Sequence, residues 1–167
     1  MKLEAIVAVY EDWGIGDGGT QPVTLKADRA HFREVTQGAA VIVGRKTLED
    51  FPGGRPLKGR HNIVVTRQAP EIDGAEVVHS TEEALQAAEQ YERCLVIGGA
   101  SVYEQFFQLL ETIHVTKIGC CPVSTRFFPN LDRDPAWRCE EEGPLFEENG
   151  IPYQFLTYRR SKNEKER

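Results

Sequence analysis

The stretch LVIGGAS, residues 95–101, decides the fold, because a short apolar run leads directly into paired glycines and then into a helical pattern. Two other apolar runs end similarly: residues 40–43 lead into Gly-Arg-Lys-Thr, and residues 62–65 lead into Thr-Arg. Near-continuous apolar strands that alternate with helices are typical of a mostly parallel sheet covered on both faces. The sequence therefore predicts an α/β fold whose strand ends carry polar chemistry.

The rest of the chain extends this pattern. Short runs rich in β-branched residues predict strands at 5–9, 40–43, 62–66, 76–79, 95–97 and 112–118. Helical spacing predicts helices at 25–36, 80–90 and 101–110, the second opening with a capping box. Residues 152–160 follow a long polar connection and are expected to pair as an antiparallel edge. We expect a single domain over residues 1–160, with helices on both faces of one central sheet, and a charged tail over residues 161–167.

Composition excludes several classes of protein. The 167 residues carry 20 Lys and Arg against 26 Asp and Glu, a formal net charge of −6, which disfavours a general nucleic-acid binder. The four cysteines lack zinc or dithiol spacing, the four histidines lack metal-ligand spacing, and the N-terminal apolar run is short. We therefore expect a reduced, cytoplasmic protein with no metal, no export signal and no membrane segment.

Three strand ends offer phosphate-binding chemistry at one edge of the predicted sheet. Ligands of open α/β sheets bind beyond the carboxyl ends of the strands, where arginine forks and glycine amides suit phosphate oxygens. At any single strand end, the simpler interpretation is that the glycine turns the chain and the arginine is a solvated surface charge. Their coincidence at three ends favours an anion site, although neither G-x-G-x-x-G nor the P-loop motif is present.

Two further features point to a ligand pocket. Asp28 shares a helical face with Leu25, Phe32 and Val35, so its carboxylate is predicted to point inward. The alternative is that Asp28 simply favours the first helical turn through the helix dipole. Residues 12–22 contain four glycines in six positions and are suited to form a lid, or an ordinary surface loop.

These pieces, in this order and spacing, resemble the dihydrofolate reductase family from residue 5 to about residue 160. The matching segments are GIG (14–16), LKADRAHF (25–32), VIVGRKT (41–47), RPLKGRHN (55–62), VIGGASVY (96–103) and FFP (127–129). The resemblance implies an oxidoreductase of one-carbon metabolism and an antifolate target, which transfers a hydride from NADPH to dihydrofolate.

On the substrate side, the resemblance implies that Asp28 binds the pterin and favours protonation of the reducible imine, with support from Thr116. It also implies that Phe32 packs on the pterin and that Arg60 pairs with the glutamate carboxylate of dihydrofolate. The remaining implied substrate contacts are the carbonyls of Ile6 and Ile97 and the side chain of Leu57.

On the cofactor side, the resemblance implies that Arg45, Thr66 and Arg67 hold the 2′-phosphate of NADPH. The pyrophosphate is assigned to Lys46, Thr47 and the amides after a cis Gly98-Gly99 peptide. The nicotinamide is assigned to Ala8, Ile15 and Tyr103. The full set of implied cofactor residues is Ala8, Ile15, Gly16, Gly44, Arg45, Lys46, Thr47, Thr66, Arg67, Gly98, Gly99, Ala100, Ser101, Val102 and Tyr103.

The chain departs from the family pattern at four places. Val23 stands where the lid usually has Trp, and Arg29 replaces an apolar residue, so that it either turns outward or reaches the acidic end of the substrate. Leu48 replaces a common Trp. The segment Ser124-Thr125-Arg126 precedes the FFP segment where the family commonly has an Asp, which predicts a weaker link between this loop and the lid.

Two rival functions follow from the same residues. One is an NADPH-dependent reductase of another heterocycle, of the riboflavin-pathway type, and the other is a catalytically weak folate- or nucleotide-binding protein. The combination of Asp28 and Arg60 favours folate over the first rival, and only the missing lid Trp favours the second. We expect a monomer that binds no nucleic acid.

Overall fold

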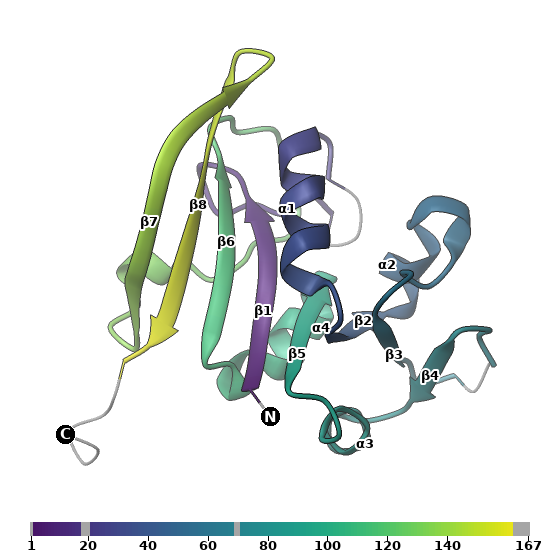
Figure 1. The fold of residues 1–167 in the computed structure, drawn as a ribbon. Coiled ribbons are helices and arrows are strands. Elements are labelled where there is room, and N and C mark those ends of the chain that lie inside the picture. Colours follow the sequence, from purple (N-terminus) through teal and green to yellow (C-terminus); the bar gives the residue numbers. More distant parts are fainter. Residues whose placement is uncertain (1, 18–20, 69–70, 162–167) are drawn as a thin grey trace.

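The computed structural model describes residues 2–17, 21–68 and 71–161 and contains one eight-stranded sheet (Figure 1). The strand order is β4-β3-β2-β5-β1-β6-β8-β7, parallel from β4 to β6 and antiparallel at β8 and β7. The strands are β1 Lys2–Val9, β2 Ala40–Gly44, β3 His61–Val65, β4 Ala75–Val78, β5 Arg93–Gly98, β6 Thr112–Ile118, β7 Trp137–Glu148 and β8 Ile151–Arg160. The predicted mostly parallel sheet with an antiparallel C-terminal edge is confirmed.

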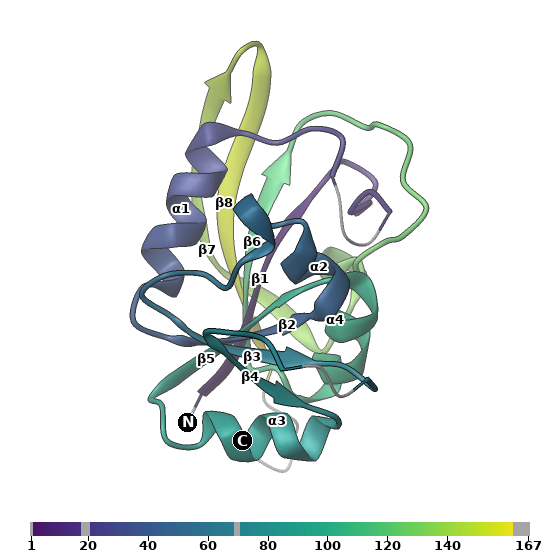
Figure 2. The ribbon, with the colours of Figure 1, turned by 90° about the vertical axis from the view of Figure 1, so that its right-hand side faces the viewer.

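Helices cover both faces of the sheet (Figure 2). They are α1 Lys26–Thr36, α2 Arg45–Glu49, α3 Thr81–Ala88 and α4 Ala100–Phe106, with short 3-10 turns at Pro52–Gly54, Phe107–Leu109 and Leu131–Arg133. Val41 and Leu95 pack on the face covered by α1 and α2, whereas Ile42 and Val96 pack on the face covered by α3 and α4. Burial on both faces explains why these strands are continuously apolar in sequence.

The predicted helix boundaries agree closely with the structure. Ser80 caps α3 as predicted, because its hydroxyl accepts from the Glu83 amide at 3.1 Å. The predicted helix over 101–110 is α4 followed by a 3-10 turn. The predicted tail lies outside the described residues from position 162 onward, as do residues 18–20 of the predicted lid.

One strand was missed by the sequence reasoning. The segment Trp137–Glu148, interpreted as part of a long polar connection, is the edge strand β7. Only Trp137 is fully buried in it, and charged side chains along an exposed edge hide the apolar alternation that identifies a strand. The available signal was Asn149-Gly150, a two-residue turn with φ of 52° and 81° that joins β7 to β8.

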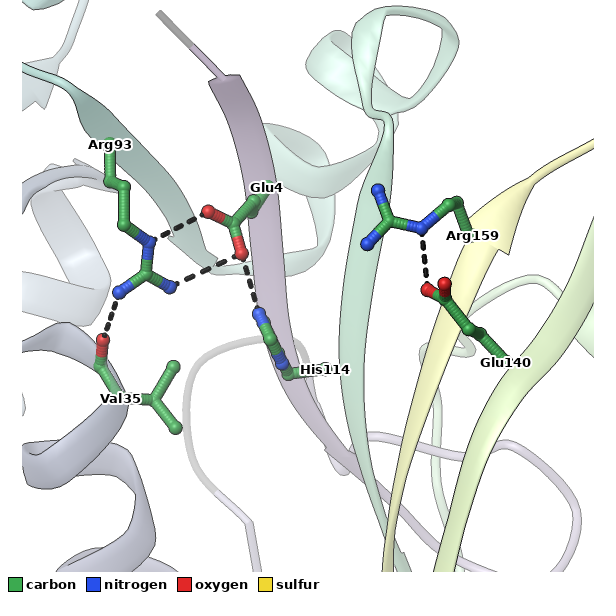
Figure 3. A network of polar contacts seen from close by, with 6 residues as sticks. All are labelled: Glu4, Val35, Arg93, His114, Glu140 and Arg159. Carbon is green, nitrogen blue, oxygen red and sulfur yellow. Dashed lines mark hydrogen bonds and ion pairs between the residues drawn. The ribbon is translucent and has the colours of Figure 1, made fainter.

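A partly buried ion-pair network anchors the carboxyl end of α1 (Figure 3). Arg93 donates from Nη1 to the Val35 carbonyl at 3.1 Å, and from Nε to the Glu4 carboxylate at 2.9 Å. The Nε2 atom of His114 lies 2.6 Å from the other Glu4 oxygen. Burial raises the pKa of Glu4, but the His114 and Arg93 contacts outweigh it and lower that pKa to about 2. The charged carboxylate therefore ties β1, β5, β6 and α1 together.

Replacing Glu4 with Gln is expected to lower the free energy of unfolding at neutral pH by about 1.5 to 3 kcal/mol, the range for hydrogen bonds to charged groups. The folded-state pKa lies below the ordinary value of 4.5, so this stabilisation is present above pH 4.5 and is lost as pH falls toward about 2. Urea unfolding at neutral and acidic pH measures the difference. Glu92→Gln is the matched control, and an equal deficit at both pH values would contradict the assignment.

Candidate active site

The Asp28 carboxylate lies against the sheet between α1 and β6. The Thr116 hydroxyl donates to Asp28 Oδ1 at 2.6 Å, which is the inward orientation that the helical spacing predicts. Burial raises the pKa of Asp28, and the hydrogen bond from Thr116 offsets this only in part. A partly buried carboxyl group with a raised pKa is suited to proton exchange with a ligand.

The predicted substrate residues meet on the α1 face of the sheet. Ile6 and Ile97, on β1 and β5, belong to one apolar cluster against which Phe32 and Leu57 pack. The Ile6 carbonyl already accepts a hydrogen bond from the Tyr103 hydroxyl at 2.7 Å, a contact that the sequence did not predict. A carbonyl oxygen has a second lone pair, so Ile6 can still accept from a ligand.

Arg60 has an unused buried donor. Its Nε atom is buried and has no hydrogen-bond partner among the residues that the structure describes, while Nη1 reaches the Thr36 hydroxyl at 3.4 Å. Burial and the positive charge of Arg33 both lower the pKa of Arg60. The buried Asn62 side chain holds this segment by bonding the backbone of Leu57 and Arg60. An anionic ligand group would satisfy both the open donor and the local excess of positive charge.

The three glycine- and arginine-bearing strand ends converge on one cleft of about 790 Å³. Arg45, Lys46 and Arg67 line it, and Arg45 is held by Glu49 at 3.2 Å and by Gln68. An adjoining pocket of about 90 Å³ is lined by Ala8, Ile15, Gly98, Tyr103 and others. Every predicted cofactor residue lines one of these two spaces except Gly16. The Gly98-Gly99 peptide is cis, as the family resemblance implies.

Gly16 instead joins the described part of the predicted lid to the 124–126 loop. Its amide donates to the Ser124 hydroxyl at 3.1 Å, and its carbonyl accepts from the amides of Thr125 and Arg126 at 2.8 and 3.0 Å. A Cβ atom on the neighbouring Gly14 would lie 2.3 Å from Ser124 Oγ, so the two segments are in close contact. Absence of the common Asp therefore does not remove the link, because a neutral hydroxyl and backbone groups make it.

Ser124→Ala is expected to weaken this link without unfolding the protein. The Gly16 amide loses its side-chain acceptor, while the backbone bonds to Thr125 and Arg126 remain. We expect about a threefold to tenfold faster release of the cofactor, corresponding to the roughly 1 kcal/mol of one hydrogen bond, and a thermal midpoint within a few degrees of wild type. Stopped-flow fluorescence measures the release rate. An unchanged rate would mean that the backbone bonds alone hold the lid.

The structure also shows the contacts made at the other three departures from the family pattern, Arg29, Leu48 and Val23. Arg29 turns toward Thr24 and donates to its hydroxyl at 3.1 Å. Leu48 is fully buried in the α1-face core. Val23 packs beside Leu25, and its backbone exchanges two hydrogen bonds with the Tyr10 hydroxyl, at 2.8 and 3.0 Å.

Gln21 is a pocket residue that the sequence reasoning missed. Its side-chain amide donates to the Ala8 carbonyl at 2.7 Å inside the pocket assigned to the nicotinamide. Its position at the end of the glycine-rich loop was the only signal available in the sequence.

Comparison with known proteins agrees with this geometry. The family model for dihydrofolate reductase matches residues 2–160. This chain belongs to the dihydrofolate reductase family. The dihydrofolate reductase of Neisseria gonorrhoeae is 36% identical over 159 residues, covering 95% of this chain and 98% of the relative. That of Bacillus subtilis is 38% identical over 155 residues, covering 90% of each chain.

A solved dihydrofolate reductase has the same fold. The Enterococcus faecalis enzyme, described as complexed with NADP(H) and RAB-propyl, superposes with a TM-score of 0.86 at 30% identity, covering 96% of this chain and 97% of that one. Within residues 2–17, 21–68 and 71–161, no helix is long and apolar enough to cross a bilayer.

Proposed function

We propose that this chain reduces 7,8-dihydrofolate to 5,6,7,8-tetrahydrofolate by hydride transfer, with NADPH as the cofactor. Membership of the dihydrofolate reductase family assigns this oxidoreductase activity. The residue roles rest on the hydrogen-bonded Asp28–Thr116 pair. This pair lies on the same sheet face as the apolar cluster of Ile6 and Ile97 and the buried Nε donor of Arg60, which is unpaired among the described residues.

On the substrate side, Asp28 holds the pterin through its 2-amino group and ring nitrogen and favours protonation of the imine, while Thr116 orients the carboxylate. Phe32 and Leu57 pack on the two ring systems of dihydrofolate. The Ile6 and Ile97 carbonyls accept from the exocyclic amine. Arg60 pairs with the glutamate carboxylate, which would give its buried Nε atom a partner.

The cofactor cleft fits a dinucleotide with a 2′-phosphate. Arg45, Thr66 and Arg67 follow the neighbouring strands β2 and β3, line the 790 Å³ cleft and supply donors for that phosphate. Lys46, Thr47 and the backbone after Gly99 line the route of the pyrophosphate toward the smaller pocket. When bound, NADPH supplies the hydride. The protein aligns the two ligands and excludes water, and Asp28 favours protonation of the substrate imine.

A single assay tests the activity. Loss of NADPH absorbance is followed with purified protein, with and without dihydrofolate. Turnover that requires dihydrofolate supports the proposal, whereas tight binding of both ligands without turnover would identify a binding protein. Turnover only with a ribosylated pyrimidine would identify the riboflavin-type alternative, which has no need of the Asp28 and Arg60 pair.

We further propose that the enzyme acts as a cytoplasmic monomer in one-carbon metabolism, does not bind nucleic acid, and folds as one domain over residues 1–160. The acidic net charge and the four unpaired thiols support these assignments. Analytical ultracentrifugation of the purified protein tests the monomer.

A further inference from the structure

Helix α1, which carries Asp28, begins without a local cap. Its N-cap residue is Leu25, whose extended backbone opens the helix and whose apolar side chain is 2% exposed and accepts no hydrogen bond. The first amides of any α-helix have no partner within the helix. Acceptors for these amides therefore come from solvent or from another part of the chain.

Glu148, near the C-terminal end of the chain, supplies acceptors for two of these amides. The Lys26 amide donates to Glu148 Oε2 at 2.8 Å and the Ala27 amide donates to Oε1 at 2.9 Å, across 122 and 121 residues of sequence. One carboxylate thus caps two consecutive amides and also places negative charge at the positive end of the helix dipole. These two hydrogen bonds lower the pKa of Glu148, which keeps it charged.

The β7–β8 hairpin presents Glu148 in a fixed position. Glu148 pairs with Ile151 across the two-residue turn formed by Asn149 and Gly150. The same hairpin makes a second contact with the helix, because the His31 ring stacks on the Phe155 ring with centroids 4.0 Å apart and planes 24° apart. Asp28 lies between these two attachments, immediately after Ala27.

We propose that Glu148 is a positioning residue for the reaction: by capping α1 from the hairpin, it fixes where the Asp28 carboxylate stands against Thr116 and the pterin. This inference rests on the proposed function. A shift of about 1 Å in a carboxylate relative to its substrate can lower the rate up to 10²-fold. Because the capped Ala27 amide is adjacent to Asp28, loss of the cap should lower the reaction rate.

The charge of Glu148 also acts on Asp28. Burial raises the pKa of Asp28, and the Glu148 carboxylate raises it further, whereas Thr116, His31 and Arg29 lower it. The titratable and polar groups around Asp28 come from four elements and are Arg29 and His31 of α1, Tyr103 of α4, Thr116 of β6 and Glu148 of β7. Removing the Glu148 charge alone should therefore lower the pKa of Asp28.

Two variants separate the cap from the charge. Glu148→Ala removes both acceptors, and we expect kcat/KM for dihydrofolate to fall about tenfold. Glu148→Gln keeps the size and one amide acceptor, so we expect a smaller loss and a shift of the kcat pH profile toward lower pH. The dissociation constant of NADPH should stay within about twofold of wild type in both, because the cofactor cleft lies at other strand ends.

Glu147→Gln is the matched control. It makes the same charge change one residue earlier, where successive strand side chains point to opposite faces. We expect its kcat/KM and pH profile to equal those of wild type.

The outcomes distinguish the possible failures. A lower thermal midpoint for Glu148→Ala with unchanged kcat/KM and pH profile in both variants would show a purely structural cap and overturn the inference. If Glu148→Ala does not fold, the pH profile of Glu148→Gln decides. A wild-type protein without dihydrofolate reduction would instead overturn the proposed function.

Discussion

Asp28→Asn is expected to lower kcat for dihydrofolate about 10²- to 10³-fold at neutral and higher pH, within the range for loss of a general acid–base group. Burial raises the pKa of Asp28, so the wild-type carboxyl exchanges protons over a range extending above that of an ordinary aspartate. Asn keeps the shape and can still contact Thr116, but it cannot exchange a proton.

The pH profile is the decisive measurement for this prediction. As pH falls, solvent increasingly supplies the proton that the Asp28 carboxyl no longer provides. The loss of kcat in Asp28→Asn should therefore become smaller in acid. Glu34→Gln makes the same charge change at an exposed position of α1 and should leave the profile unchanged. A deficit that is constant across pH would assign Asp28 to substrate binding alone.

Arg45→Ala should weaken NADPH binding about 10- to 100-fold and NADH binding by less than about twofold, because only NADPH has the 2′-phosphate that an arginine fork reads. Arg45 is paired with Glu49 at an exposed site, where an ion pair contributes little to stability. Exchanging this partner for a dianionic phosphate therefore favours the bound state.

Fluorescence titration with both cofactors measures the selectivity. Arg138→Ala is the control, since it removes one exposed positive charge on β7, at the other edge of the sheet from the cleft strands. Equal losses of NADPH and NADH affinity in Arg45→Ala would show that the side chain does not read the 2′-phosphate.

The placement of positive charge explains how an acidic protein can bind two anionic ligands. The net charge is −6, yet Arg45, Lys46 and Arg67 line one cleft, and Arg33 and Arg60 lie together on the α1 side. Local concentration of positive charge, not the overall balance, sets the potential that a ligand meets.

Much of the fold follows from local signals in the sequence. Continuous apolar runs such as residues 95–97 identify strands buried on both faces, and the Ser80 capping box identifies the start of α3, because both patterns report on backbone conformation within a few residues. Strand β7 was not predicted from the sequence. Most of its side chains are exposed, so burial does not require apolar residues at alternate positions.

By itself the sequence determined the parallel sheet, the strand ends that converge on the cleft and the inward face of Asp28, all of which depend on periodicity and on the rule that parallel strands end at one edge. Only the tertiary structure decided that Glu148 caps α1, that the Ser124 hydroxyl accepts from the Gly16 amide and that Tyr103 bonds the Ile6 carbonyl. The partners in these contacts are 97 to 122 residues apart. A side-chain hydrogen bond over such a separation has no local pattern, because its partner is selected by how the elements pack.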